Sequence, residues 1–157
     1  MIFNPALLVL EDGRSFLGQS FGAEGETFGD VVISTGLTDY QETLTNPSNA
    51  HKVVIATVPH TGNTGWESTA PIRIVVAGYV VRDPSPRPSS FRPLPSLGEY
   101  MNAQNIVGIS DIDTRALTRH LRDHGPMKLG ISTLDLDPIS MAAKVRAFST
   151  MNGDNNA

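Results

Sequence analysis

The sequence of 157 residues contains no cysteine. Disulfide bonds, thiolate metal sites and catalysis by a cysteine nucleophile are therefore excluded for this chain. The sequence is also poor in basic residues, because 12 Lys and Arg stand against 16 Asp and Glu and give a formal net charge of −4. Binding to a nucleic-acid backbone needs a basic surface that displaces counterions. The charge balance thus disfavours a general nucleic-acid binder.

Long hydrophobic runs are missing as well. The apolar run at residues 6–10 is too short for a signal peptide or a membrane span, and residues 1–5 contain no Lys or Arg. We therefore expect a soluble, cytoplasmic protein without a membrane partner. A hydrophobic content of 39% is enough for one domain with a sizeable core. We expect this domain to span residues 1–148, followed by a disordered polar tail at residues 149–157.

The order of the elements predicts an α/β fold with a mixed sheet. Residues 6–10 and 15–18 indicate an opening β-hairpin with Asp12 and Gly13 in its turn. Further strands are predicted at 31–33, 52–57, 72–81, 106–109 and 127–132. Short helices are predicted at 38–44 and 96–104 from their capping boxes, and a last helix from Asp137 and Pro138 onwards.

The clearest helix is predicted over residues 110–125. Two aspartates stand at its start, Leu117 and Leu121 recur four apart, and Gly125 with the following proline ends it. On another face Arg115, Arg119 and Arg122 follow at i, i+4 and i+7; we call these three residues the arginine column.

The arginine column has two interpretations. Guanidinium groups hold carboxylates or phosphates through paired hydrogen bonds, whereas a solvated charged helix face is the commoner case. His120 and His124, four apart on the same helix, could bind a metal ion. Two imidazoles without a third ligand make a poor site, so we expect no metal.

Six segments of the chain occur in the order of one known family. They are ALLVLEDGRSFLG at 6–18, STGLTDYQETLTNPS at 34–48, VPHTGNTG at 58–65, VAGYVVRD at 76–83, SSFR at 89–92 and GISDIDTRALTRHLRDHG at 108–125. With these segments the chain resembles the amino-terminal domain of the small subunit of glutamine-dependent carbamoyl-phosphate synthetase. The resemblance covers nearly the whole chain, from about residue 6 to residue 148.

The resemblance implies a three-layer β/β/α domain that docks on the large synthetase subunit. A following amidotransferase domain, in the same gene product or in another chain, would hydrolyse glutamine with a cysteine–histidine–glutamate triad. The large subunit would use the ammonia to make carbamoyl phosphate for pyrimidine and arginine biosynthesis. Without cysteine, this chain cannot form the glutamyl thioester. We therefore expect a non-catalytic docking and scaffold domain without a cofactor, lacking the amidotransferase domain.

The resemblance also suggests one substrate contact. The serine of the family's Asp/Asn-Pro-Ser motif lies beside the glutamine pocket, and its match here is Ser48. From the sequence alone, a helix-terminating turn residue is the commoner interpretation of this serine. The sequence departs from the family at Asp39, where glycine is usual, and at residues 66–71. The alternative function is a stand-alone ligand-binding or regulatory module, with a site at the loop of residues 59–65 near Ser48.

Overall fold

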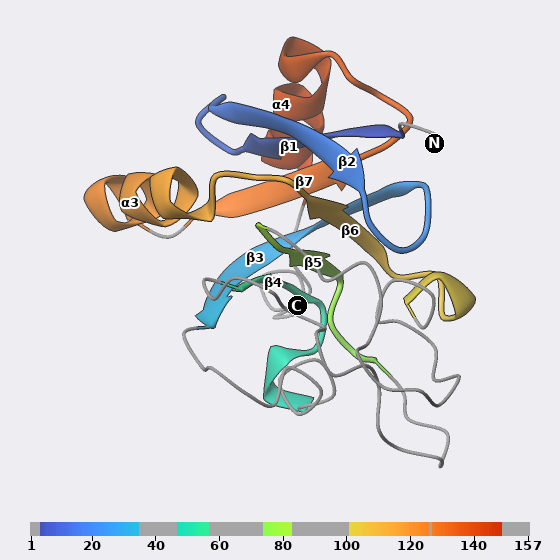
Figure 1. Cartoon of the computed structure of the whole chain (residues 1–157). Helices are drawn as coiled ribbons and strands as arrows, with labels where there is room; N and C mark the ends of the chain where they lie inside the picture. The colour runs from blue at the N-terminus through green and yellow to red at the C-terminus, as the bar shows by residue number, and fades with distance from the viewer. Residues whose placement is uncertain (1–3, 35–46, 57–73, 83–100, 126, 149–157) are drawn as a thin grey trace.

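The computed structural model describes residues 4–34, 47–56, 74–82, 101–125 and 127–148 (Figure 1). Its strands are β1 (Pro5–Leu10), β2 (Ser15–Ser20), β3 (Glu26–Ser34), β4 (Lys52–Ala56), β5 (Gly78–Val80), β6 (Val107–Ser110) and β7 (Lys128–Ser132). Its helices are the 3-10 turn η1 (Pro47–Asn49), α3 (Thr114–His124) and α4 (Pro138–Ala147), and residues 101–103 are also helical. No described helix is long and apolar enough to cross a membrane.

The described strands form one closed sheet in the order β1-β2-β6-β5-β4-β3-β7 (Figure 1). Strands β3, β4, β5 and β6 run parallel to their neighbours within this set, and the remaining pairs are antiparallel. The α/β class with a mixed sheet is therefore confirmed. The three-layer arrangement is not confirmed, since the strands close on themselves as a barrel.

The opening hairpin is confirmed in its position and turn. The backbone N–H of Leu10 donates to the carbonyl oxygen of Arg14 at 2.8 Å. The backbone N–H of Gly13 donates to the carbonyl oxygen of Leu10, also at 2.8 Å. Gly13 has φ of 100°, which a glycine reaches without steric cost. The turn fixes the register of β1 and β2, in which Leu7 lies opposite Leu17.

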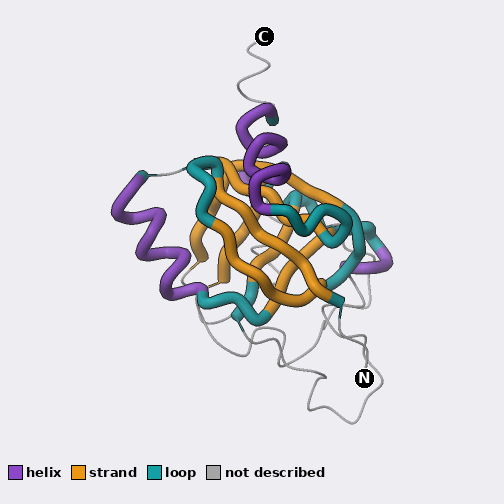
Figure 2. The backbone as a smooth tube through the Cα atoms, turned by 90° about the horizontal axis from the view of Figure 1, so that it is seen from above, coloured by secondary structure: helices purple, strands orange, loops and turns teal. Residues whose placement is uncertain are grey.

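Strand β1 is buried along almost its whole length because both of its faces are covered. Leu8 and Leu10 point into the barrel and join its core, whereas Leu7 and Val9 pack with Met141 of α4 on the outside. This arrangement explains the continuous apolar run at residues 6–10. Figure 2 shows α4 lying against the outer surface of the barrel.

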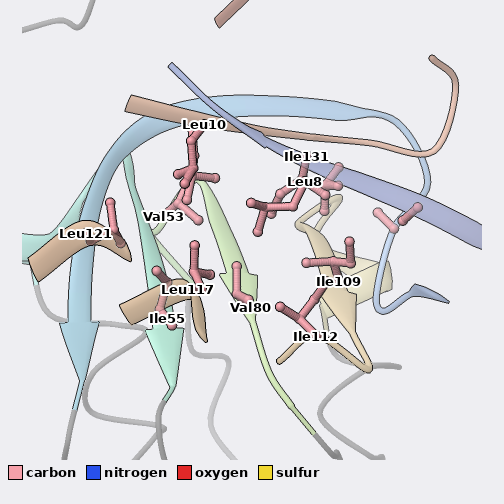
Figure 3. Close-up of a cluster of buried hydrophobic side chains, with 14 residues drawn as sticks. Leu8, Leu10, Val53, Ile55, Val80, Ile109, Ile112, Leu117, Leu121 and Ile131 are labelled. Atoms are coloured by element: carbon pink, nitrogen blue, oxygen red, sulfur yellow. The ribbon is translucent and has the colours of Figure 1, made fainter. Parts of the chain in front are cut away.

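The main core fills the barrel interior (Figure 3). Side chains from β1, β4, β5, β6 and β7 meet there with the buried leucines of α3. Strand β4, predicted as a central strand, is hydrogen-bonded to β3 and β5 and is buried from Val53 to Ala56. Each fully buried Leu or Ile contributes roughly 1.5–3 kcal/mol of transfer free energy. The barrel interior is therefore packed with side chains.

Two predicted element boundaries are wrong. The helix predicted from residue 110 begins at Thr114, because Ser110 stays in the ladder opposite Gln19 and Asp111 takes a left-handed φ of 62°. In the strand predicted over 72–81, residues 72 and 73 lie outside the described residues, and the described part is a strand only at Gly78–Val80.

Other predicted elements are longer than expected or lie outside the described residues. The short apolar strand predicted at residues 31–33 is part of the nine-residue strand β3. The predicted helix at 38–44, most of the one at 96–104 and the tail at 149–157 fall outside the described residues.

The last helix is confirmed and is held by an ionic network. Asp137 caps it by accepting from the N–H of Ile139 at 3.1 Å, with Pro138 in the first turn. Lys144 Nζ lies 3.0 Å from Glu26 and 3.1 Å from Asp135. The Ser140 hydroxyl, the N–H of Asp137 and Lys144 together lower the pKa of Asp135 to about 2.

Substitution Gly18→Ala should destabilise the fold strongly. A Cβ at this position would overlap the carbonyl oxygen of Ser110 on β6 and lie 2.9 Å from Cδ1 of Ile112. Such overpacking lowers the free energy of unfolding by about 1–3 kcal/mol, measurable by urea denaturation. The control Leu17→Ala, at a side chain 64% exposed, should change it by no more than about 0.5 kcal/mol. Equal effects of the two substitutions would refute the tight β2–β6 contact.

The Asp135 network predicts a specific pH dependence. Because the pKa of Asp135 is lower in the folded protein than its ordinary value of 3.8, its ionised form stabilises the fold above about pH 4. This contribution is lost as the pH falls towards 2. The variant Asp135→Asn should therefore be less stable than the parent at pH 6, and the gap should close at low pH. Denaturation curves of both proteins, with Asp123→Asn as the surface control, measure this; a gap independent of pH would contradict it.

Candidate functional site

Helix α3 is positioned by its apolar side. Leu117 and Leu121 are buried in the barrel core (Figure 3), and the carboxylate of Asp113 caps the helix by accepting from the N–H of Ala116 at 3.0 Å. The N–H of Gly125 donates to Leu121 at 2.8 Å and ends the helix. In Figure 1 the helix extends from one side of the barrel. One face is thus fixed on the core, which leaves the opposite face outward.

The arginine column lies on this outward face. All three of its residues are exposed, and none forms an ion pair with an acidic group among the described residues. Arg115 and Arg122 are separated by about 10 Å along the helix axis at 1.5 Å per residue. Arg122 benefits from the helix dipole in the last turn, whereas Arg115 in the first turn does not. The helix dipole therefore gives no stabilising reason for a positive charge at position 115.

A second polar group joins α3 to the hairpin turn. His120 Nε2 lies 2.6 Å from the carboxylate of Asp12, and the rings of His120 and His124 stack with centroids 4.2 Å apart. Burial raises the pKa of Asp12, but the Arg14 backbone N–H and His120 outweigh it and lower that pKa overall. The contact ties the β1–β2 turn to the helix.

The sequence did not reveal this pair. The sequence pattern indicates only a turn residue at Asp12, and His120 lies 108 positions further along the chain. No local spacing links residues so far apart, so only the pairing of strands brings them together.

These histidines show no metal-binding arrangement. His124 Nδ1 is 3.0 Å from the carbonyl of His120, and the His120 ring nitrogen is occupied by Asp12. No group of three or more potential metal ligands occurs among the residues that the structure describes. The two imidazoles are therefore engaged in structural contacts.

Ser48 is exposed in the turn η1, which ends two residues before β4 begins. The turn is closed by the N–H of Ala50, which donates to Pro47 at 3.1 Å, and His51 follows with φ of 65°. This geometry agrees with a turn residue and leaves the side chain at the surface. The loop at 59–65, Asp39 and the segment at 66–71 lie outside the described residues. The structure therefore places Ser48 and the arginine column on separate elements.

Comparisons with known proteins identify the relatives of the chain. The family model described as "Carbamoyl-phosphate synthase small chain, CPSase domain" matches residues 8–131. The carbamoyl phosphate synthase small chain of Streptomyces avermitilis is 55% identical over 98% of this chain and 41% of its own length. The small chains of Streptomyces coelicolor and Mycobacterium tuberculosis are 54% and 50% identical, over 95% and 96% of this chain and 40% and 42% of theirs.

The chain spans about two fifths of the length of these relatives. The matched part is their amino-terminal region, as the resemblance of the six sequence segments predicted. Because the family model covers most of the chain and several relatives are at least 50% identical to it, this protein belongs to the carbamoyl-phosphate synthase small-chain family.

Proposed function

We propose that this chain is a non-catalytic docking and scaffold domain of the small subunit of a glutamine-hydrolysing carbamoyl-phosphate synthetase. Its family membership and its match to the amino-terminal two fifths of the relatives support this assignment. The absence of cysteine supports the non-catalytic part, since a glutamyl thioester needs a thiolate nucleophile. No cofactor is assigned to the chain.

Two partners follow from this proposal. An amidotransferase domain, carried by the same gene product or by a separate chain, releases ammonia from glutamine. The large subunit binds the scaffold and uses the ammonia for carbamoyl phosphate, which enters pyrimidine and arginine biosynthesis in the cytoplasm. The scaffold contributes by holding the two partners at a fixed distance and orientation, which favours transfer of the intermediate.

The arginine column is the observation that carries the docking role. Three guanidinium groups line one outward face of α3 without an acidic partner among the described residues, although the chain has a net charge of −4. A surface of local positive charge on an acidic protein is suited to a partner that presents carboxylates. We assign this face to the contact with the large subunit. For this family, a protein partner with carboxylates is a better ligand of the arginine column than a phosphate or a nucleic acid.

Ser48 is proposed as a contact to the glutamine pocket of the amidotransferase domain. Its exposed position on the short turn η1 supports this role, because a second domain could approach it from solvent. The hydroxyl group can both donate to and accept from a bound amide.

Substitution Arg119→Ala should weaken assembly with the large subunit of the Streptomyces avermitilis synthase. Loss of one charged interface contact should raise the dissociation constant by roughly twofold to tenfold, more at low than at high salt. Titration calorimetry at two salt concentrations measures this effect. The control Arg146→Ala, on α4, removes an exposed arginine outside the column and should leave affinity unchanged. Equal affinity of Arg119→Ala and the parent would contradict an interfacial role of Arg119.

A thermal-shift experiment separates the docking domain from a stand-alone binding module. A ligand that binds only the folded state raises the unfolding temperature. The isolated chain should show no shift with millimolar glutamine or with metabolite anions, because its proposed glutamine contact needs the second domain. A saturable shift with one of these compounds would favour the stand-alone module.

A further inference from the structure

His51, which lies between the turn η1 and the strand β4, has a left-handed backbone conformation. Its φ is 65°, a value that only a few per cent of residues other than glycine adopt. Asn105 and Asp111 are the other non-glycine residues with positive φ in the described part of the chain. A residue in this region persists only where its surroundings enforce the conformation, and such residues cluster at functional sites.

The surroundings of His51 enforce its conformation from two sides. Its N–H donates to the carbonyl oxygen of Val75 at 3.1 Å. On another side its carbonyl oxygen lies close to β3, because a Cβ added to Gly29 would approach that oxygen to 2.8 Å. The next residue, Lys52, is the first of β4 and lies opposite Asp30 of β3. Two neighbouring segments therefore hold the backbone of His51 in place.

The side chain of His51 gives no reason for this conformation. It is exposed, and it forms no hydrogen bond or ion pair with any other residue that the structure describes. The contacts of this position are those of its backbone N–H and carbonyl groups. What the position provides is therefore a direction of the chain.

The direction at His51 decides where Ser48 lies. A change of φ rotates the chain about the N–Cα bond, so it swings the residues before His51 relative to β4. These residues form one unit, because the N–H of Ala50 donates to the carbonyl oxygen of Pro47 at 3.1 Å. A change to the common φ near −65° is a rotation of roughly 130°. Such a rotation would displace Ser48, three residues before His51, by several ångströms.

We propose that His51 is a positioning residue for glutamine, because its left-handed backbone holds η1 where Ser48 reaches the glutamine pocket of the amidotransferase domain. This inference rests on the proposed function, in which Ser48 contacts that pocket. His51 does not touch the substrate and acts only through the turn. A hydrogen bond weakens steeply when its donor and acceptor leave their optimal distance and angle. The backbone at position 51 therefore determines whether the contact forms.

Two substitutions at position 51 separate the backbone from the side chain. Valine is β-branched and strained at positive φ, so His51→Val should displace the turn. Glycine adopts positive φ without strain, so His51→Gly should keep the turn while removing the same side chain.

Glutamine hydrolysis is measured in a chimera, assembled with the large subunit of the Streptomyces avermitilis synthase. In the chimera this chain continues at Ala157 into the part of the Streptomyces avermitilis small chain beyond the match. His51→Val should raise the KM for glutamine roughly threefold to tenfold, the affinity commonly lost with one hydrogen bond. The kcat should stay within about twofold, because the lost contact binds the substrate and the transition state alike. His51→Gly should have the KM of the parent.

Gly13→Ala is the control for general destabilisation. Gly13 also has positive φ, of 100°, and a Cβ at this position would meet no atom within 4 Å, so alanine adds only backbone strain. The β1–β2 hairpin that contains it and the turn η1 lie at opposite ends of the barrel (Figure 1). Gly13→Ala should lower the unfolding temperature and leave the KM unchanged. If His51→Val does not fold, Gly29→Ala repeats the test, because its Cβ would displace the His51 carbonyl.

Hydrogen exchange of the isolated chain, followed by NMR, tests the backbone step without a partner. The N–H groups of Ala50 and of residue 51 are both hydrogen-bonded in the parent. Their protection factors should fall on the order of tenfold or more in His51→Val, because the turn no longer holds its hydrogen bonds. In His51→Gly they should stay within about threefold of the parent values.

Four results would overturn the inference. They are a parental KM in His51→Val, an equal rise of KM in His51→Val and His51→Gly, a similar rise in Gly13→Ala, and unchanged protection of the Ala50 N–H in His51→Val. The last result applies whether or not the chimera is active.

The variant Ser48→Ala tests the proposed function separately. A raised KM in Ser48→Ala with a parental KM in His51→Val refutes only the inference. A parental KM in Ser48→Ala, together with lost protection of the turn in His51→Val, refutes the proposed glutamine contact of Ser48.

Discussion

The structure depends on the pairing of strand β1 along both of its edges. Hydrogen bonds to β2 and to β7 close the sheet, so that the barrel has an interior for Leu8 and Leu10. The same strand presents Leu7 and Val9 to α4 on the outside. A polar residue on either face would expose the core or release the helix. The position of α4 therefore follows from a strand near the amino terminus.

Sequence reasoning predicted the features that depend on neighbouring residues. Short patterns of turn, apolar and capping residues indicate the Asp12–Gly13 turn, the buried strand at residues 52–57 and the Asp137–Pro138 helix start. The turn and the helix start are confirmed, and the strand is confirmed over its described residues, Lys52–Ala56. The start of α3 was wrong by four residues, because pairing of Ser110 with Gln19 overrides the local helical signal. Closure of the barrel joins strands more than 90 residues apart, and no periodicity of the sequence reports such pairs.

The candidate site shows the same division. The exposed arginine face was visible in the spacing of three residues, because helical geometry alone places them together. The contact between Asp12 and His120 was invisible, since it depends on the tertiary packing of α3 beside the hairpin. The exposure of Leu134, Leu136 and Ile139 could likewise be judged only once α4 had been placed on the barrel. Chemistry at the surface of this domain is thus set by which element covers which face.

The central claim is that the domain is a docking part of a synthetase and has no activity of its own. Native mass spectrometry of this chain mixed with the large subunit of the Streptomyces avermitilis synthase tests that claim most directly. The account predicts a complex of one chain with one large subunit that dissociates as the salt concentration rises, because part of the contact is between charges. Two separate species at low salt, with both proteins folded and at concentrations well above the micromolar range, would contradict it.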